Sequence, residues 1–119
     1  RVDVPQDSSR SADRREVEKE RKRQEGELRN RLYRETKTLR NRIADIEKEM
    51  ERNDTRLREI EAILADPLSC EDRDEFNRML NDYEKVKNRN AILNEEWMEK
   101  SLEVEEVRAS IMGNTLSEG

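Results

Sequence analysis

Residues 39 to 64 read LRNRIADIEKEMERNDTRLREIEAIL, and apolar side chains recur along this stretch at alternating steps of four and three residues. This spacing places them on one stripe of an α-helix and is typical of a coiled-coil seam. A single helix with one apolar stripe is only marginally stable in water, so the pattern predicts a second helix that covers it. The seam positions are Leu39, Ile43, Ile46, Met50, Asn53, Leu57, Ile60 and Leu64.

The same chain supplies a second seam after residue 72, spaced again by three and four residues. Asp66-Pro67 ends the first helix, because proline has no backbone donor and disfavours a helical conformation in the residue before it. The short connection favours antiparallel neighbours. The second seam comprises Phe76, Met79, Tyr83, Val86, Asn90, Leu93, Trp97, Lys100, Val104, Val107 and Ile111.

The two seams stay in phase if Leu64 meets Phe76 across the turn. The sequence therefore predicts an all-α fold, an antiparallel two-helix coiled-coil hairpin with a basic N-terminal helical overhang. Asn53 and Asn90 fall in adjacent layers. Their amides either bond to each other or are two tolerated polar positions of the seam that stay partly hydrated. The predicted layers include Leu57 with Tyr83, Met50 with Asn90, and Ile43 with Trp97. The position opposite Ile43 favours a core role for Trp97 over the alternative, an aromatic side chain that recognises a partner.

The predicted boundaries follow from local signals. Residues 1–12 lack periodicity and are expected to be a disordered linker. Asp13 and Glu16 stand at capping-box spacing, so the hairpin is predicted over 13–112, with a first helix at about 14–65. A turn at 66–72 contains two candidate caps, Ser69 and Asp72, for a second helix at about 73–112.

Two glycines affect the predicted helices in different ways. Gly26 costs about 1 kcal/mol relative to alanine inside a helix, which makes a bend or fraying plausible there. Gly113 is expected to take the left-handed C-terminal cap, so 113–119 is predicted to be a flexible tail.

Composition excludes several classes of function. The chain has 119 residues, 46% of them charged, with one cysteine and no histidine, so neither an intramolecular disulfide nor a metal site of nitrogen and sulfur ligands is expected. No run of residues resembles a membrane span, a phosphate loop or a catalytic constellation. We expect a non-enzymatic, cytoplasmic segment without catalytic, cofactor or metal residues, and its start without methionine suggests a piece of a longer protein.

Charge is distributed unevenly. Residues 10–42 contain 13 Lys and Arg against 7 Asp and Glu, whereas residues 43–119 contain 11 against 21. Guanidinium groups along a helix edge can follow a nucleic-acid backbone without reading bases. An ordinary charged helix surface is the alternative interpretation. The candidate nucleic-acid-binding residues are Arg14, Arg15, Lys19, Arg21, Lys22, Arg23, Arg29, Arg31, Arg34 and Lys37.

Three segments together resemble a known family: KRQEGELRNRL, the heptads TLRNRIADIEKEMERNDTRLREIEAILADPL, and NEEW in the second helix. From about Arg14 to Met112, the chain resembles the C-terminal coiled-coil domain of Uup-like ABC-F ATPases. Relatives often have a proline just before the Leu-Arg pair, where this chain has Thr38, so the resemblance favours a continuous helix there.

The resemblance implies a soluble parent protein with two ATP-binding cassettes, for which ATP and magnesium are expected as cofactors. It implies an arm that engages ribosomal RNA or duplex DNA, and residues 1–12 would then connect it to a cassette. The rival hypothesis is a passive structural or dimerisation coiled coil without nucleic-acid affinity. A helical arm like that of seryl-tRNA synthetase is a third alternative.

Overall fold

The computed structural model describes residues 3–118 and consists of two long helices joined by a short turn. Helix α1 spans Asp3–Ala65, the 3-10 helix η1 spans Pro67–Ser69, and α2 spans Arg73–Glu118. No strand occurs among these residues. The chain divides into two compact units, which we call the hairpin unit, Thr38–Glu106, and the terminal unit, formed by the remaining described residues.

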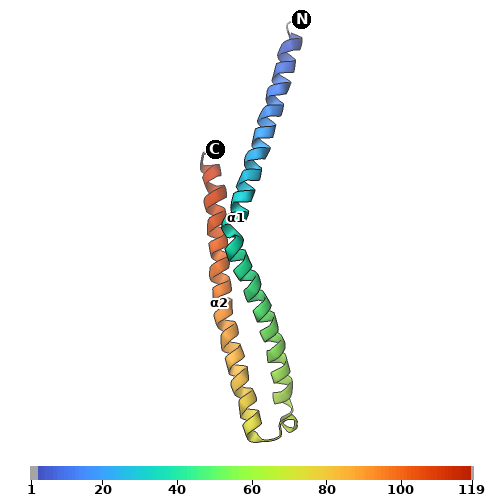
Figure 1. Ribbon diagram of the computed structural model, residues 1–119, viewed down its shortest axis with the longest axis vertical. Helices are drawn as coiled ribbons and strands as arrows, with labels where there is room; N and C mark the ends of the chain where they lie inside the picture. Colours follow the sequence, from blue (N-terminus) through green and yellow to red (C-terminus); the bar gives the residue numbers. More distant parts are fainter. Residues whose placement is uncertain (1–2, 119) are drawn as a thin grey trace. The chain divides into compact units, whose positions relative to one another are not determined.

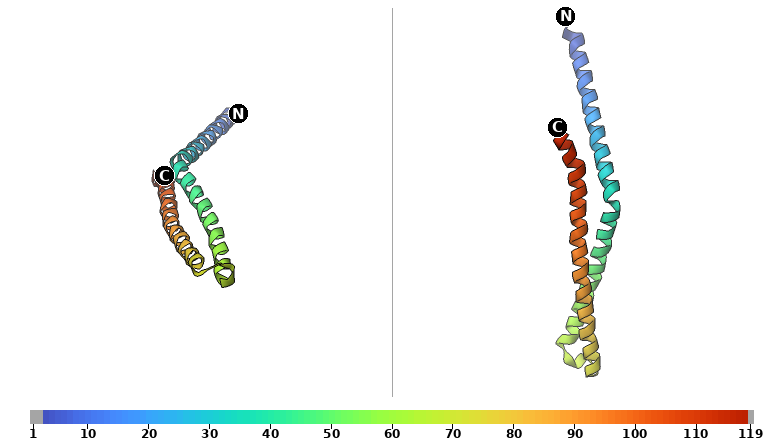
Figure 2. Two further views of the ribbon diagram at one scale, coloured as in Figure 1. Left: turned by 60° about the horizontal axis from the view of Figure 1, so that its bottom comes forward. Right: turned by 90° about the vertical axis from the view of Figure 1, so that its left-hand side faces the viewer.

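The hairpin unit contains the second part of α1 and most of α2, which run antiparallel on either side of the turn (Figures 1 and 2). Its three fully buried side chains are Ile46, Ile60 and Leu93, and all three are predicted seam residues. Every other predicted seam position of this unit is half-buried. The predicted all-α antiparallel hairpin is therefore confirmed.

Hydrogen bonds between the two helices fix their register. Asn53 donates through Nδ2 to Oδ1 of Asn90 at 2.9 Å, so of the two alternatives for this pair the structure has the one in which the amides bond to each other. Trp97 donates through Nε1 to Oε1 of Glu47 at 3.0 Å, one helical turn beyond Ile43. Partners in these bonds have residue numbers that add up to about 140, as the predicted layers do.

The end of α1 is closed by a side chain from the turn. The Ser69 hydroxyl lies 2.9 Å from the carbonyl oxygen of Ile63 and 2.6 Å from that of Asp66, to which it donates. The backbone N–H of Leu68 donates to Oδ1 of Asp66 at 3.2 Å. Terminal carbonyls without partners in the helix are thus satisfied locally.

Helix α2 begins with a variant of the capping box. Asp72 accepts through Oδ1 from the backbone N–H of Glu75 at 2.8 Å, so Asp72 is the N-cap. Glu75 reaches back to the N–H of Glu71, also at 2.8 Å, rather than to the N–H of the cap residue. Ser69, the other predicted candidate, instead caps α1.

The predicted helix boundaries are wrong at both outer ends. Helix α1 begins at Asp3 rather than near Arg14. Pro5 is tolerated there because it falls in the first turn, where a backbone N–H has no acceptor within the helix. Helix α2 continues through Gly113, which has no positive φ, to Glu118. Residues 1, 2 and 119 lie outside the described chain, and a linker role for 1–12 stays a prediction.

The terminal unit contains residues 3–37 of α1 and the shorter end of α2, residues 107–118. Ile111 is 2% exposed, and Leu28, Leu32 and Val107 are half-buried. Thr36 is also buried, and its hydroxyl donates to the carbonyl oxygen of Leu32 at 2.7 Å. Helix α1 continues without interruption through Gly26.

Candidate nucleic-acid interface

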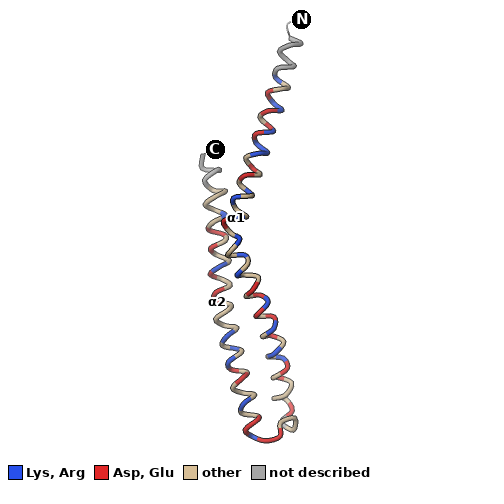
Figure 3. Tube along the Cα trace, viewed as in Figure 1, with Lys and Arg blue, Asp and Glu red and all other residues tan. Residues whose placement is uncertain are grey.

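The overhang, residues 14–27 of α1, presents its side chains to solvent. Every side chain from 10 to 25 is exposed, including the apolar Val17 at 68%. Lys and Arg are interspersed with Glu along this segment (Figure 3). A helix that is polar all round has no apolar face to bury, so its stability depends on interactions between neighbouring turns.

Two arginines of the overhang supply these interactions. Arg21 bonds to Glu18 and, through Nη1 at 2.9 Å, to Oε1 of Glu25. Arg23 bonds to Glu20 and, through Nη1 at 3.2 Å, to Oε1 of Glu27. The hydrogen bonds from the two guanidinium groups lower the pKa of Glu18 and of Glu20. Two of the predicted nucleic-acid-binding residues therefore already hold carboxylates.

Four other predicted cations lie on one side of the overhang. Arg14, Arg15, Lys19 and Lys22, together with Glu18, line one shallow depression on α1. Within the described chain, no carboxylate lies within the 4.0 Å of an ion pair from any of these four. We call these four residues the basic face. Composition alone does not show that these four cations lack ion pairs whereas Arg21 and Arg23 form them.

The remaining predicted cations follow along α1. Arg31 donates through Nε to Oε1 of Glu35 at 3.0 Å. Arg29, Arg34 and Lys37 are exposed, and the described residues place no carboxylate within ion-pair distance of them. The structure thus places all ten candidates on α1 and leaves seven of them available for an external anion.

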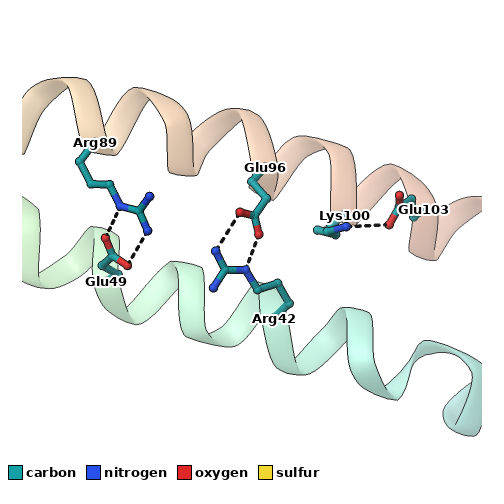
Figure 4. Close-up of polar contacts among 6 residues, drawn as sticks. All are labelled: Arg42, Glu49, Arg89, Glu96, Lys100 and Glu103. Carbon is teal, nitrogen blue, oxygen red and sulfur yellow. Dashed lines mark hydrogen bonds and ion pairs between the residues drawn. The ribbon is translucent and has the colours of Figure 1, made fainter.

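Ion pairs in the hairpin unit have a structural role that sequence reasoning missed (Figure 4). Arg42 bonds to Glu96, with Nη2 and Oε1 2.8 Å apart. Arg89 bonds to Glu49 through Nε at 2.7 Å and Nη2 at 3.1 Å. Both are two-pronged contacts between helices, and they lower the pKa of Glu96 and of Glu49. Arg42 directly precedes a seam residue, which is the signal that could have indicated its role.

A groove beside the seam is the second feature that the sequence reasoning missed. It has a volume of about 360 Å³ and lies where Trp97 and Asn94 of α2 face α1. Trp97 is half-buried at this edge, so it packs at the seam as predicted while one side of it borders the groove. The α1 residues that line the groove are Glu47, Met50, Glu51 and Asp54.

Among the described residues, no group of three or more His, Cys, Asp and Glu side chains is arranged to hold a metal ion. Neither described helix has an apolar stretch long enough to cross a membrane. Comparison with known proteins found no matching family model, curated protein or solved structure.

Proposed function

We propose that this chain is a non-catalytic nucleic-acid-binding arm, and that duplex DNA or ribosomal RNA binds to the basic face of its overhang. The observation that supports this most is the set of four cations, Arg14, Arg15, Lys19 and Lys22, on one exposed side of α1. They have no carboxylate partner within the described chain. Binding a phosphate there does not require breaking an existing ion pair.

The geometry suits contact with a phosphate backbone better than contact with bases. Cations three and four residues apart follow each other along α1 at about 4.5 to 6 Å, from the rise of 1.5 Å per residue. Phosphate contacts of this kind position a protein without carrying sequence information. The only aromatic side chain near these cations in sequence is Tyr33, so stacking of several bases in a row has no platform. We therefore expect binding that is largely independent of sequence.

The proposed biological setting comes from the resemblance to ABC-F ATPases. In that setting, the arm belongs to a cytoplasmic ATPase linked to translation or DNA transactions. ATP and magnesium would bind to the cassettes of the parent protein and to no residue of this chain. The resemblance rests on the ELR segment, the charged heptads ending in LADP, and the NEEW motif of α2.

The test is a titration of a labelled duplex with matched lysine variants. Lys19→Gln/Lys22→Gln removes two cations from the basic face. Lys48→Gln/Lys85→Gln removes two exposed lysines of the hairpin unit that likewise have no carboxylate partner among the described residues. Only the first pair is expected to weaken binding at low salt. Equal losses in the two variants would contradict a localised interface.

The alternative function is a passive structural or dimerisation coiled coil. It is favoured by Arg21 and Arg23, whose contacts with four glutamates stabilise the overhang itself. In that case the overhang is a solvated spacer, and the parent chain does not bind the duplex even at low salt.

A further inference from the structure

The groove beside Trp97 is lined by three acidic residues. Glu47, Glu51 and Asp54 line it, and among the described residues no Lys or Arg lies within 4.0 Å of their carboxylates. Glu47 accepts from Trp97, and Asp54 accepts from Nδ2 of Asn90 at 2.9 Å. Each of these carboxylates has oxygen lone pairs that can accept further hydrogen bonds.

The groove also has an apolar wall. The indole of Trp97 and the side chain of Met50 line it beside the carboxylates. An aromatic face next to negative charge favours the ammonium or guanidinium group of a Lys or Arg, whose methylene stem can lie along the apolar surface. The chemistry of the groove therefore fits a cationic side chain rather than a neutral ligand.

The spacing of the acids matches a set of cations in the same chain. Glu47, Glu51 and Asp54 stand at positions i, i+4 and i+7 of α1. Arg15, Lys19 and Lys22 of the basic face have the same spacing. Both sets therefore repeat at about 6 Å and then about 4.5 Å along a helix axis. Two such helix surfaces laid side by side can bring three opposite charges together in register.

We propose that the basic face of one chain docks into the acidic groove of a second copy. The contact joins two different surfaces, so it is heterologous and can continue from copy to copy or close into a ring. Its charges are exposed, so its strength should be modest and should fall as added salt screens them. Nucleic acid would compete for the same cations, but the docking itself does not depend on nucleic-acid binding.

The experiment is a charge reversal followed by sedimentation equilibrium over a concentration series at low salt. Lys19 and Glu51 are the central members of the two sets, and neither side chain has an ion-pair partner within the described chain. Lys19→Glu and Glu51→Lys should each weaken self-association roughly three- to tenfold, because a modest attraction becomes a repulsion. Glu51→Lys leaves the basic face untouched, so its effect is separate from any effect on nucleic-acid binding.

Two recombinations make the prediction specific. A mixture of the two single variants should associate, because the intact basic face of one faces the intact groove of the other. The double variant Lys19→Glu/Glu51→Lys should recover most of the parent affinity, because the opposite charges are restored in exchanged positions. Matched controls are Lys85→Glu and Glu99→Lys, exposed residues of α2 that do not line the groove and should leave association unchanged.

Trp97 provides a second readout, because it is the only tryptophan of the chain and lines the groove. Its emission should change with protein concentration at low salt, and this change should disappear at high salt. Circular dichroism should show that each variant keeps the parent's helicity. A parent that stays monomeric at low salt would overturn the proposal. So would association that the two reversals do not weaken, or a double variant weaker than either single one.

Discussion

Ile46 is fully buried in the hairpin unit. Ile46→Ala should lower the free energy of unfolding by about 2 to 4 kcal/mol, because it removes buried methyl groups and leaves a cavity. Ile92, which is 57% exposed, provides a control with the same chemistry. Ile92→Ala should cost less than about 0.5 kcal/mol in the same urea titration. Equal costs for the two variants would contradict the seam.

The Asn53–Asn90 pair is polar but satisfied, and its removal should be strongly non-additive. Asn53→Leu leaves Oδ1 of Asn90 without its donor. Asn90→Leu leaves Nδ2 of Asn53 without its acceptor and the Asp54 carboxylate without its donor. Each single variant should be destabilised, since an unsatisfied polar group costs about 1 to 3 kcal/mol. The double variant should recover part of that loss. Additive effects in a thermodynamic cycle would show that the amides do not interact.

At the scale of the helices, the ion pairs Arg42–Glu96 and Arg89–Glu49 link α1 to α2 and make stability depend on pH. The arginines lower the pKa of both glutamates below the ordinary value of 4.5. The folded state therefore holds fewer protons than the unfolded state as pH falls past that value. The stabilisation that these two ion pairs contribute is complete above pH 4.5 and is lost as pH falls through the lowered pKa values.

The measurement compares Tm for the parent and for Glu49→Gln/Glu96→Gln. The parent should melt at the higher temperature at neutral pH, and the gap should close on acidification, once the parent's own carboxylates are protonated. A gap that stays constant down to acidic pH would show that these charges do not contribute through ionisation.

The sequence predicts the middle of each helix better than its ends. The seams and Pro67 determine the two helices and their register, because burial of apolar side chains at steps of three and four allows one pairing. The outer ends depend on smaller energies. Glycine is a frequent C-terminal cap of helices. A helix that continues through Gly113 nevertheless costs only about 1 kcal/mol relative to alanine at that position. Local preference of this size is easily overridden, which explains why the predicted tail from 113 is helical up to Glu118.

The candidate interface was predictable only in part. Counting charges locates the cations on the first helix, and all ten lie there. Counting does not show which cations are already paired with a carboxylate. Pairing depends on the rotamers that bring acids three or four residues away into contact. Arg21 and Arg23 sit among the same acids as Lys19 and Lys22, but only the two arginines form ion pairs. The acidic groove was missed because its residues come from both helices.

For the molecule as a whole, the uneven charge distribution has functional consequences that net charge conceals. The formal net charge is -5, but residues 10–42 carry a surplus of cations and residues 43–119 a surplus of acids. A nucleic acid should therefore be attracted to the terminal unit and repelled from much of the hairpin unit. The same polarity would let one copy attract the opposite part of another.

The most direct test of the proposed function is the salt dependence of duplex binding by the parent and by Lys19→Gln/Lys22→Gln. Each phosphate neutralised by the basic face releases counterions, so log Kd should rise linearly with log salt concentration, by about 0.9 per contact. Removing two cations should weaken binding at low salt and flatten this slope by roughly 1 to 2. An unchanged slope, or no binding by the parent at low salt, would contradict the proposed interface.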